Sequence, residues 1–348
     1  MSTLVEPRRS GRRITRTDVA REAGTSVAVV SYVVNDGPRP VAAATRQRVL
    51  DAIARTGYRP DSIARALAAG STLSYGLVVP SIANPFFAEL AHAVEDRLFA
   101  AGRVLLLGDS AESKQRETEL IASLHEHRVE GLLVVGVDDR PEVADLVADA
   151  TPVVALDRLP SPGRTAAVSI DNRAAARAAV EHLIGHGHRT VGILAGPAGL
   201  STAVEREQGW RDALSAAGLA EAPVARAGFD KRGGYETALR LLAGPERPTA
   251  LFVSSDQQAI GVLRAAHELG VAVPEQLAVV TFDGTQDTRY SVPALSTVVQ
   301  PTSELAEVAV RLLLDRDGFA PVHRRLAFSL ELRRSCGCAA VPDPEEPR

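Results

Sequence analysis

Short apolar runs alternate with helix-like stretches along most of the chain after residue 72. The stretches between the runs, such as NPFFAELAHAVEDRLFAAG and SDQQAIGVLRAAHELG, have the spacing of amphipathic helices. Continuous apolar strands joined by helical crossovers are typical of parallel sheets that are covered on both faces. The pattern therefore predicts an α/β body. The expected strands are YGLVVP, RVLLLG, GLLVVG, PVVALD, TVGILAG, TALFVSS and LAVVTFD.

The number of these runs favours more than one sheet, because so many strand and helix units exceed what one compact sheet of usual size holds. A chain of 348 residues with 45% hydrophobic content can also fill more than one core, so we expect two or three domains. The end of the chain, PDPEEPR, is polar, and residues 339–348 are expected to be a disordered tail.

The N-terminal region has a different pattern, in which two short helices are separated by a glycine. A cap residue, a tight turn and a second cap at this spacing are typical of a helix-turn-helix. Asp18 in the first turn suits the positive end of the helix dipole. The expected landmarks are Thr15 and Ser26 as N-caps, Gly24 in the turn, Asn35 closing the helix Val27 to Val34, and Val19, Ala20 and Ala23 as a buried stripe.

A third amphipathic stretch, ATRQRVLDAIARTGYRP, is expected to close a small three-helix core. Its apolar face would consist of Val49, Leu50, Ile53 and Ala54. The arginines of the region would stay outside as phosphate contacts, and they are Arg16, Arg21, Arg46, Arg48, Arg55 and Arg59. A small helical bundle without a nucleic-acid partner is the alternative.

Charge supports the nucleic-acid interpretation only weakly. Residues 1–71 hold 12 arginines against 6 acidic residues, whereas the remainder holds 27 basic and 37 acidic residues, which gives the whole chain a net charge of −4. A basic N-terminal region on an acidic body suggests that the N-terminus faces a polyanion. Many solvated chain ends are basic without such a partner.

The second helix offers few groups for reading bases directly. In a helix-turn-helix this helix enters the major groove by its N-terminal residues, here Val27 and Ala28, with Ser31 and Tyr32 one turn later. Apolar side chains can touch a thymine methyl group but cannot form bidentate hydrogen bonds. A further contact is expected from PDSIARALAAGST, a short helix former in which Leu67 could wedge into a minor-groove step. A plain linker is the alternative there.

The ordered motifs of the chain resemble those of the lactose-repressor/galactose-repressor family of bacterial transcription factors. The resemblance covers essentially residues 14 to 338 and is carried by DVAREAGTSVAVVSYVVN, TRQRVLDAIARTGYRPDSIARALAAGST, IANPFFAEL, HGHRTVGILAG, EREQGWRDAL and PALSTVVQP. It implies a DNA-binding headpiece, a hinge helix, and a two-lobed, periplasmic-binding-protein-like core that dimerises and binds a small effector, commonly a sugar or nucleobase.

The expected domains follow from this resemblance. They are a basic arm at 1–13, a helix-turn-helix at 14–59, a hinge at 60–72 and a core at 73–338. Within the core, lobe 1 is expected at about 73–168 and 302–321, and lobe 2 at about 169–301 and 322–338.

The resemblance also assigns DNA-binding positions. It places Val27, Ala28 and Tyr32 at base-reading positions, Leu67 at the intercalating hinge position, and Ala64 and Arg65 beside it. The full expected set is Thr15, Thr17, Ser26, Val27, Ala28, Ser31, Tyr32, Asn35, Ala64, Arg65 and Leu67. Because Val29 and Tyr32 replace the Thr and Arg of many relatives, the operator sequence stays open, although a pseudo-palindrome with a central CG step is the family expectation.

Residues that follow the apolar runs are candidates for the effector site, since ligands of such proteins lie at the carboxyl ends of the strands. A sugar-like ligand needs an aromatic platform together with charged donors and acceptors. Arg206 in EREQGW matches the family arginine that contacts the effector, and Leu200 and Thr202 match nearby positions. The expected set is Phe86, Phe87, Asp157, Arg158, Leu200, Thr202, Arg206, Phe229, Asp256 and Asp283. Asp157 and Arg158 pairing with each other is the structural alternative.

Other classes of protein receive less support. HEH (125–127) and HLIGHGH (182–188) resemble metal ligands only superficially, and Cys336 and Cys338 are interpreted as ordinary tail thiols, so we expect no metal and no cofactor. No stretch reaches the roughly 18 to 20 apolar residues that span a bilayer. The first residues lack the apolar segment of a signal peptide, so we expect a cytoplasmic protein. The same observation disfavours the alternative of a transport-type sugar-binding protein. We expect a homodimeric regulator, most often a repressor in this family, and not an enzyme.

Overall fold

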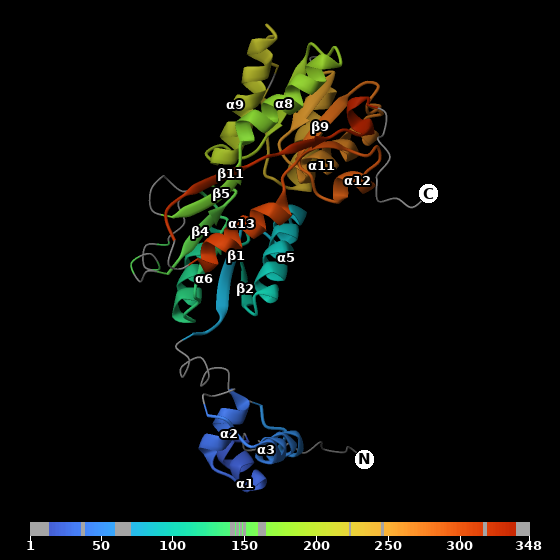
Figure 1. Cartoon of the computed structure of the whole chain (residues 1–348). Coiled ribbons are helices and arrows are strands. Elements are labelled where there is room, and N and C mark those ends of the chain that lie inside the picture. The colour runs from blue at the N-terminus through green and yellow to red at the C-terminus, as the bar shows by residue number, and fades with distance from the viewer. Residues whose placement is uncertain are drawn as a thin grey trace, which may run out of the picture. The chain divides into compact units, whose positions relative to one another are not determined.

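The computed structural model in Figure 1 describes residues 14–35, 39–59, 71–139, 143, 146, 148, 151–158, 165–222, 224–244, 247–315 and 319–338. The chain divides into two compact units, Met1–Thr72 and Leu73–Arg348. The expected arm at 1–13, the hinge residues Ala64, Arg65 and Leu67, and the tail at 339–348 lie outside the described residues.

The first unit contains three helices, α1 (Arg16–Ala23), α2 (Val27–Val34) and α3 (Ala43–Thr56), as the sequence predicted. Thr15 caps α1 in a capping box with Asp18, and the side chain of Ser26 accepts a hydrogen bond from the α2 backbone. Gly24 has a φ of 60°, which a residue with a Cβ rarely adopts and which lets the chain turn between α1 and α2.

The core of the first unit confirms the α1 stripe but corrects part of the α3 prediction. Val49 is buried and Ile53 half-buried, whereas Leu50 is 43% exposed and Ala54 is exposed. The inward face of α3 instead passes through Ala52, because positions i, i+3 and i+4 share one side of a helix. The buried residues are Val19, Ala20, Ala23, Val30, Val33, Val49, Ala52 and Tyr58.

The second unit is built from two sheets, each with helices on both faces (Figure 1), which confirms the predicted α/β class. We call the first sheet and its helices lobe 1. All neighbouring strands of this sheet pair in parallel. In spatial order the strands are β11 (His323–Leu326), β5 (Ala166–Ile170), β4 (Val153–Leu156), β3 (Leu132–Val134), β1 (Ser74–Val79) and β2 (Val104–Asp109).

Among the described residues, three long helices cover this sheet. On one face, α5 (Pro85–Ala100) and α13 (Thr302–Leu314) share one apolar cluster with the strands. On the other face, Ile121 and Leu124 of α6 (Lys114–Glu126) pack on the sheet. Successive side chains of a strand point to opposite faces, so strands buried on both sides read as continuous apolar runs.

The second sheet and its helices form lobe 2. Its spatial order is β12 (Ser329–Glu331), β10 (Ser296–Val299), β9 (Ala278–Asp283), β8 (Ala250–Val253), β6 (Val191–Ala195) and β7 (Val224–Arg226). Only β12, at the edge, pairs antiparallel with its neighbour among the described strands. One face carries α8 (Asn172–Gly185) and α9 (Ser201–Ala216), and the other carries α10 (Lys231–Ala243) and α11 (Asp256–Glu268). Two short elements complete it, α12 (Asp287–Tyr290) and the 3₁₀ helix η1 (Arg334–Cys336).

The chain passes between the lobes after β5, after β10 and between β11 and β12. The expected boundary near residue 321 therefore differs from the structure, since β11 pairs with β5 in lobe 1. The segment RRLAFSLEL has one continuous alternating pattern, and nothing in that pattern marks the change of sheet near Ala327. Within the described residues, every helix is too short or too polar to cross a membrane.

Candidate functional site

Arg206 lies at the centre of a polar cluster between the two lobes and is only 3% exposed. Its Nε donates to Asn172 Oδ1 at 2.8 Å and its Nη1 to the Ser254 carbonyl at 2.7 Å. The guanidinium carbon lies 3.8 Å from the centre of the Phe282 ring, a stacked cation–π arrangement. Helix α9 therefore fixes a positive charge in a defined orientation at the carboxyl end of the lobe 2 sheet.

Two buried aspartates face this region from the ends of strands in different lobes. Asp157 follows β4 with a φ of 59°, and Asp283 ends β9 with a φ of 119°. Residues other than glycine are strained in this region, and such strain gathers at functional sites. Arg206 Nη1 lies 3.5 Å from Asp283 Oδ1, which also accepts a hydrogen bond from the Gln300 amide at 3.0 Å.

Burial dominates the ionisation of these carboxyl groups. It raises the pKa of Asp283 to about 7, although Arg206 acts to lower it and the charge of Asp157 adds to the rise. Burial also raises the pKa of Asp157, against the lowering effect of Arg206 and Arg158. The site therefore holds two carboxyl groups that ionise less readily than usual beside two guanidinium groups.

These residues line a narrow cavity of about 10 Å³, a volume that suits roughly one water molecule. The lining residues are Asn84, Phe86, Phe87, Asp157, Arg158, Thr202, Arg206, Phe229, Ser255 and Asp283. Most of the predicted effector residues thus meet at one place. Strands of both lobes end here, which is why residues distant in sequence converge.

Two predicted effector residues do not line this cavity. Asp256 is fully buried, and its Oδ2 accepts hydrogen bonds from the Thr285 amide and hydroxyl at 2.7 and 3.0 Å, while its Oδ1 accepts one from Thr297 at 3.1 Å. Both of its oxygens therefore hold lobe 2 loops together. Leu200 sits at the N-cap position of α9 and is absent from the lining.

Sequence reasoning missed Asn172, Ser255 and Gln300. Asn172 holds Arg206, Gln300 holds Asp283, and Ser255 lines the cavity. Each lies within two residues of the end of an apolar strand, so the strand-end rule that selected Asp157 contained the signal. Small polar residues are common at such positions, which made them hard to single out.

Buried polar atoms without partners accompany the cavity. Among the described residues, Asp157 Oδ1, Arg158 Nε and Ser254 Oγ have no hydrogen-bond partner. Arg158 Nη1 donates to the carbonyls of Gly136 and Val137, at 2.9 and 3.0 Å. Within the described residues, Arg158 lowers the pKa of Asp157 by its charge but forms no hydrogen bond or salt bridge with it. Unsatisfied buried polar atoms are costly, and a ligand that bonds to them would remove that cost.

Polar contacts also join the lobes beside the cavity. Asp139 of lobe 1 accepts hydrogen bonds from the Ser201 hydroxyl at 2.7 Å and the Ser201 amide at 3.1 Å, at the start of α9. Glu89 on α5 accepts one from the Gln286 amide of lobe 2 at 3.1 Å. These contacts hold the two lobes together beside the cavity.

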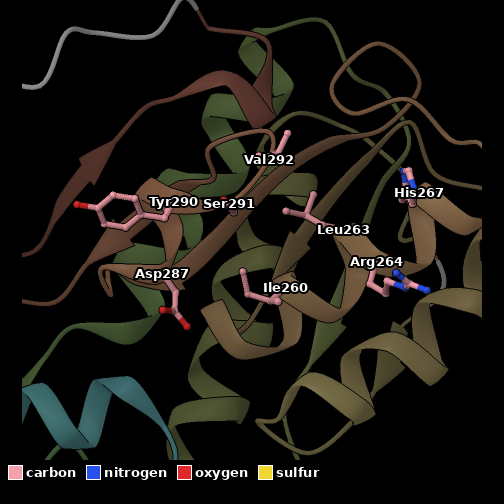
Figure 2. Close-up of a pocket in the computed structure, with 8 residues that line it drawn as sticks. All are labelled: Ile260, Leu263, Arg264, His267, Asp287, Tyr290, Ser291 and Val292. Carbon is pink, nitrogen blue, oxygen red and sulfur yellow. The ribbon is translucent and has the colours of Figure 1, made fainter.

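A larger cavity of about 450 Å³ lies elsewhere, on lobe 2. Figure 2 shows it between α11, which contributes Ile260, Leu263 and Arg264, and the segment that carries Tyr290 and Val292. Tyr290 is 83% and Val292 91% exposed. This is an open, largely apolar surface groove, and it lacks the convergent charged groups of the cavity between the lobes.

In the first unit, the start of α2 presents the predicted base-reading face. Val27 is 42% exposed, Ala28 and Thr17 are exposed, and Ser31 and Tyr32 are half-buried. Several predicted polar contacts have internal partners. The side chains of Thr15 and Ser26 cap their helices, and Asn35 Nδ2 donates to Ser31 Oγ at 3.3 Å.

Several arginines of the first unit have partners within it. Arg16 Nε donates to the Tyr58 hydroxyl at 3.3 Å, Arg55 pairs with Glu22 at 3.0 Å, and Arg48 Nη2 donates to Thr45 Oγ1 at 3.4 Å. Arg16 is half-buried, whereas Arg48, Arg55 and Arg59 lie on the exposed surface, as a phosphate contact requires.

Comparisons with known proteins agree with this arrangement. Residues 15–61 match the family described as bacterial regulatory proteins, lacI family, and residues 180–336 match a periplasmic binding protein-like domain. Catabolite control protein A of Priestia megaterium is 35% identical over 86% of this chain and 91% of that protein. The HTH-type transcriptional repressor PurR of Pasteurella multocida is also 35% identical, over 86% of this chain and 90% of the repressor.

Solved structures show the same similarity. The lac repressor dimer bound to operator and the anti-inducer ONPF superposes with a TM-score of 0.84 at 28% identity, covering 93% of this chain and 99% of that one. The complex of the transcriptional regulator CelR with cellobiose gives a TM-score of 0.70 at 30% identity, covering 93% of this chain and all of that chain. The chain belongs to the lacI family of bacterial regulatory proteins. It is a DNA-binding transcriptional regulator with an effector-binding core, in a family whose members are not enzymes.

Proposed function

We propose that a small, hydroxyl-rich effector of the sugar class binds between the lobes and controls the affinity of this regulator for its operator. The observation that carries the proposal is the cavity at the lobe boundary, where Arg206, Asp157 and Asp283 converge with aromatic rings. The similar regulator CelR forms a complex with cellobiose, which supports an effector of the sugar class.

The chemistry of the lining favours a sugar over a purely apolar ligand. The carboxyl groups of Asp157 and Asp283 can accept hydrogen bonds from neighbouring hydroxyls, and Arg206 can donate to hydroxyl or ring oxygens. The rings of Phe86 and Phe229 offer apolar faces for the C–H side of a sugar ring. A nucleobase is the second candidate, because it stacks on the same rings and also bonds to Arg and Asp.

The cavity is so small that effector binding requires the lobes to move. A space of about 10 Å³ is far below the several hundred cubic ångströms of ordinary ligand sites, so the lobes must separate for a sugar to enter. Separation would break the bonds from Asp139 to Ser201 and from Glu89 to Gln286. A ligand therefore selects among lobe arrangements, and operator affinity follows if those arrangements differ in DNA binding.

On the DNA side, we assign base contacts to Val27, Ala28 and Tyr32 in the major groove. Indirect readout of DNA shape would supply much of the specificity, because these side chains form few hydrogen bonds with bases. Leu67, with Ala64 and Arg65, is assigned to the minor groove by family resemblance.

We further propose a homodimer, as seen for the lac repressor on its operator. Exposed apolar surface supports this on both lobes, with Phe99 and Val104 on lobe 1 and Tyr290 and Val292 on lobe 2 (Figure 2). Light scattering should give twice the monomer mass for the wild type and a monomer for Val292→Glu. Val204→Glu, at a 51% exposed valine on α9, is the matched control and should remain a dimer.

The effector class is tested by thermal-shift screening of the full chain against sugars, sugar phosphates and nucleosides, since a ligand specific to the native state raises its melting temperature. The shift should disappear in Arg206→Lys, which keeps the charge but loses the planar set of donors. Arg211→Lys on the same helix, outside the cavity, should keep it. Shifts by nucleosides alone would reject the sugar class.

A further inference from the structure

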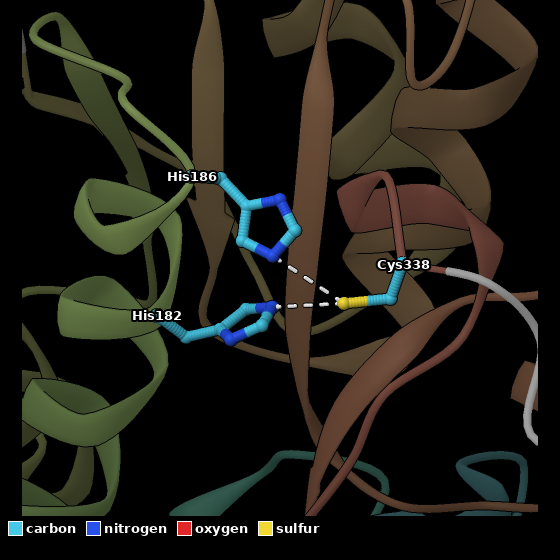
Figure 3. A group of neighbouring side chains, drawn as sticks. All are labelled: His182, His186 and Cys338. Carbon is cyan, nitrogen blue, oxygen red and sulfur yellow. Dashed lines mark hydrogen bonds between the residues drawn. The ribbon is translucent and has the colours of Figure 1, made fainter.

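Two histidines from the first helix of lobe 2 and a cysteine from the last segment of its sequence meet at the C-terminal end of α8. Figure 3 shows His182, in the last turn of α8, and His186, the C-cap residue of that helix, pointing toward the thiol of Cys338 just beyond η1. Cys338 Sγ lies 3.6 Å from His182 Nε2 and 3.4 Å from His186 Nε2. The two imidazole rings are tilted, with centroids 4.6 Å apart.

These distances match the edges of a tetrahedral metal site. With zinc bonds of about 2.3 Å to sulfur and about 2.05 Å to nitrogen, a tetrahedral angle gives a nitrogen–sulfur edge of about 3.6 Å. Both observed separations are within about 0.2 Å of that edge, so one ion could reach all three atoms with little movement of the side chains. Histidines at i and i+4 are a frequent zinc-binding pair, because they project from the same face of a helix.

A second thiol lies next to one of the histidines but outside the group. Cys336 Sγ is 3.3 Å from His182 Nε2, and its residue is 1% exposed. Ser296 Oγ, on β10, lies 3.0 Å from the same sulfur and holds its orientation. Both cysteines are free thiols in this structure. Among the described residues at this place, the ligand atoms that lie within 4.8 Å of one another are those of His182, His186 and Cys338 alone, which leaves the fourth position of a tetrahedral site open.

We propose that His182, His186 and Cys338 bind one zinc ion, which fastens the C-terminal segment to α8, with a water molecule from solvent as the fourth ligand. Imidazole and thiolate ligands select zinc among the abundant divalent ions and disfavour magnesium and calcium, which prefer oxygen ligands. The Cys338 thiol loses its proton to solvent when it binds the ion. The site is separate from the effector cavity, and none of its three residues lines that cavity.

This proposal differs from the expectation that the chain carries no metal site. The HLIGHGH motif has too few ligands by itself, and its glycines lie where α8 ends at Gly185. The third ligand, Cys338, comes from 152 residues beyond His186. Only the fold brings the ligands together, because η1 bonds to β9 and β10 beside the end of α8.

The test uses the full chain, purified without a metal-affinity column, incubated with zinc and dialysed. Metal analysis should find about one zinc per chain in the wild type. His188→Ala is the matched control, since His188 belongs to the same motif but bonds to Thr249 instead, and it should retain the ion. His186→Ala and Cys338→Ser should each lose at least tenfold in zinc affinity. Because both side chains are outside the buried core, the variants should fold, which the emission of the buried Trp210 verifies.

Cobalt provides a second readout that does not depend on stability. Bound to the wild-type chain, Co²⁺ should show the intense visible bands of a tetrahedral site together with a thiolate-to-cobalt charge-transfer band, and Cys338→Ser should weaken that band. Zinc should also raise the melting temperature of the wild type but not of His186→Ala. A wild-type chain that retains no zinc, or variants that retain as much as the wild type, would overturn the proposal.

Discussion

Asp283→Asn should make the stability of the core less sensitive to pH between 5 and 8. Asp283 is 5% exposed at the end of β9, and burial raises its pKa to about 7 from the usual 3.8. Between these values the unfolded chain loses the proton while the folded chain keeps it. The contribution of this carboxyl group therefore favours the folded state at low pH and is lost as the pH rises toward 7.

The magnitude follows from the two pKa values. At about 1.36 kcal/mol per pKa unit, the wild type loses about 2 to 3 kcal/mol from this group between pH 5 and pH 8. The asparagine variant lacks that loss. Constant effects, such as a changed bond to Gln300 or relieved strain, cancel when the variant is compared with the wild type at both pH values. The Asp283 charge also helps to raise the pKa of Asp256. Without that charge the pKa of Asp256 rises less, so the Asp256 carboxyl group also costs the variant less stability as the pH increases.

Urea unfolding monitored by Trp210 fluorescence measures this effect, because the single tryptophan of the chain is fully buried in lobe 2. The free energy of unfolding of Asp283→Asn relative to the wild type should improve by about 2 to 3 kcal/mol from pH 5 to pH 8. Asp96→Asn, at an exposed position of α5, is the control. A difference between Asp283→Asn and wild type that stays constant over this range would refute the reasoning.

Three further predictions concern packing and closure. Asp139→Ala removes both bonds to Ser201 and should favour the open lobes, seen as a larger radius of gyration of the ligand-free chain in X-ray scattering. Gly209→Ala places a Cβ about 2.2 Å from the Arg173 carbonyl where α8 and α9 cross, so urea unfolding should show a loss of about 3 kcal/mol or more. Thr15→Ala removes the capping box of α1 and should cost about 1 kcal/mol, detected as faster amide exchange in that helix.

The sequence predicted the α/β core because strands buried on both faces carry continuous apolar runs. It also located most of the cavity, since residues such as Asp157 and Asp283 directly end those runs. The buried side of a helix was harder to predict. On α3, Ala52 is buried and Leu50 is exposed, because the inward face of a small bundle has room for an alanine where the sequence favoured the larger leucine.

Contacts between distant segments could not be predicted. Asn172 supports Arg206 within lobe 2, and Cys338 meets His182 and His186 only after the sheet has formed. The passage of the chain from the lobe 1 sheet to the lobe 2 sheet after Leu326 could not be predicted either. The segment RRLAFSLEL has the same alternating pattern on both sides of that point. Single-sequence patterns specify which face a residue takes, whereas these arrangements depend on which elements become neighbours.

The central claim is that occupancy of the cavity between the lobes controls DNA affinity. The direct test selects the preferred DNA from a genomic fragment library and measures its affinity for the full chain with and without a compound that stabilises the core. We predict at least a fivefold change for the wild type and for Arg211→Lys, and no change for Arg206→Lys, which should still bind the same fragment. An equal response of Arg206→Lys, or no preference of the wild type for any fragment over bulk competitor DNA, would contradict the account.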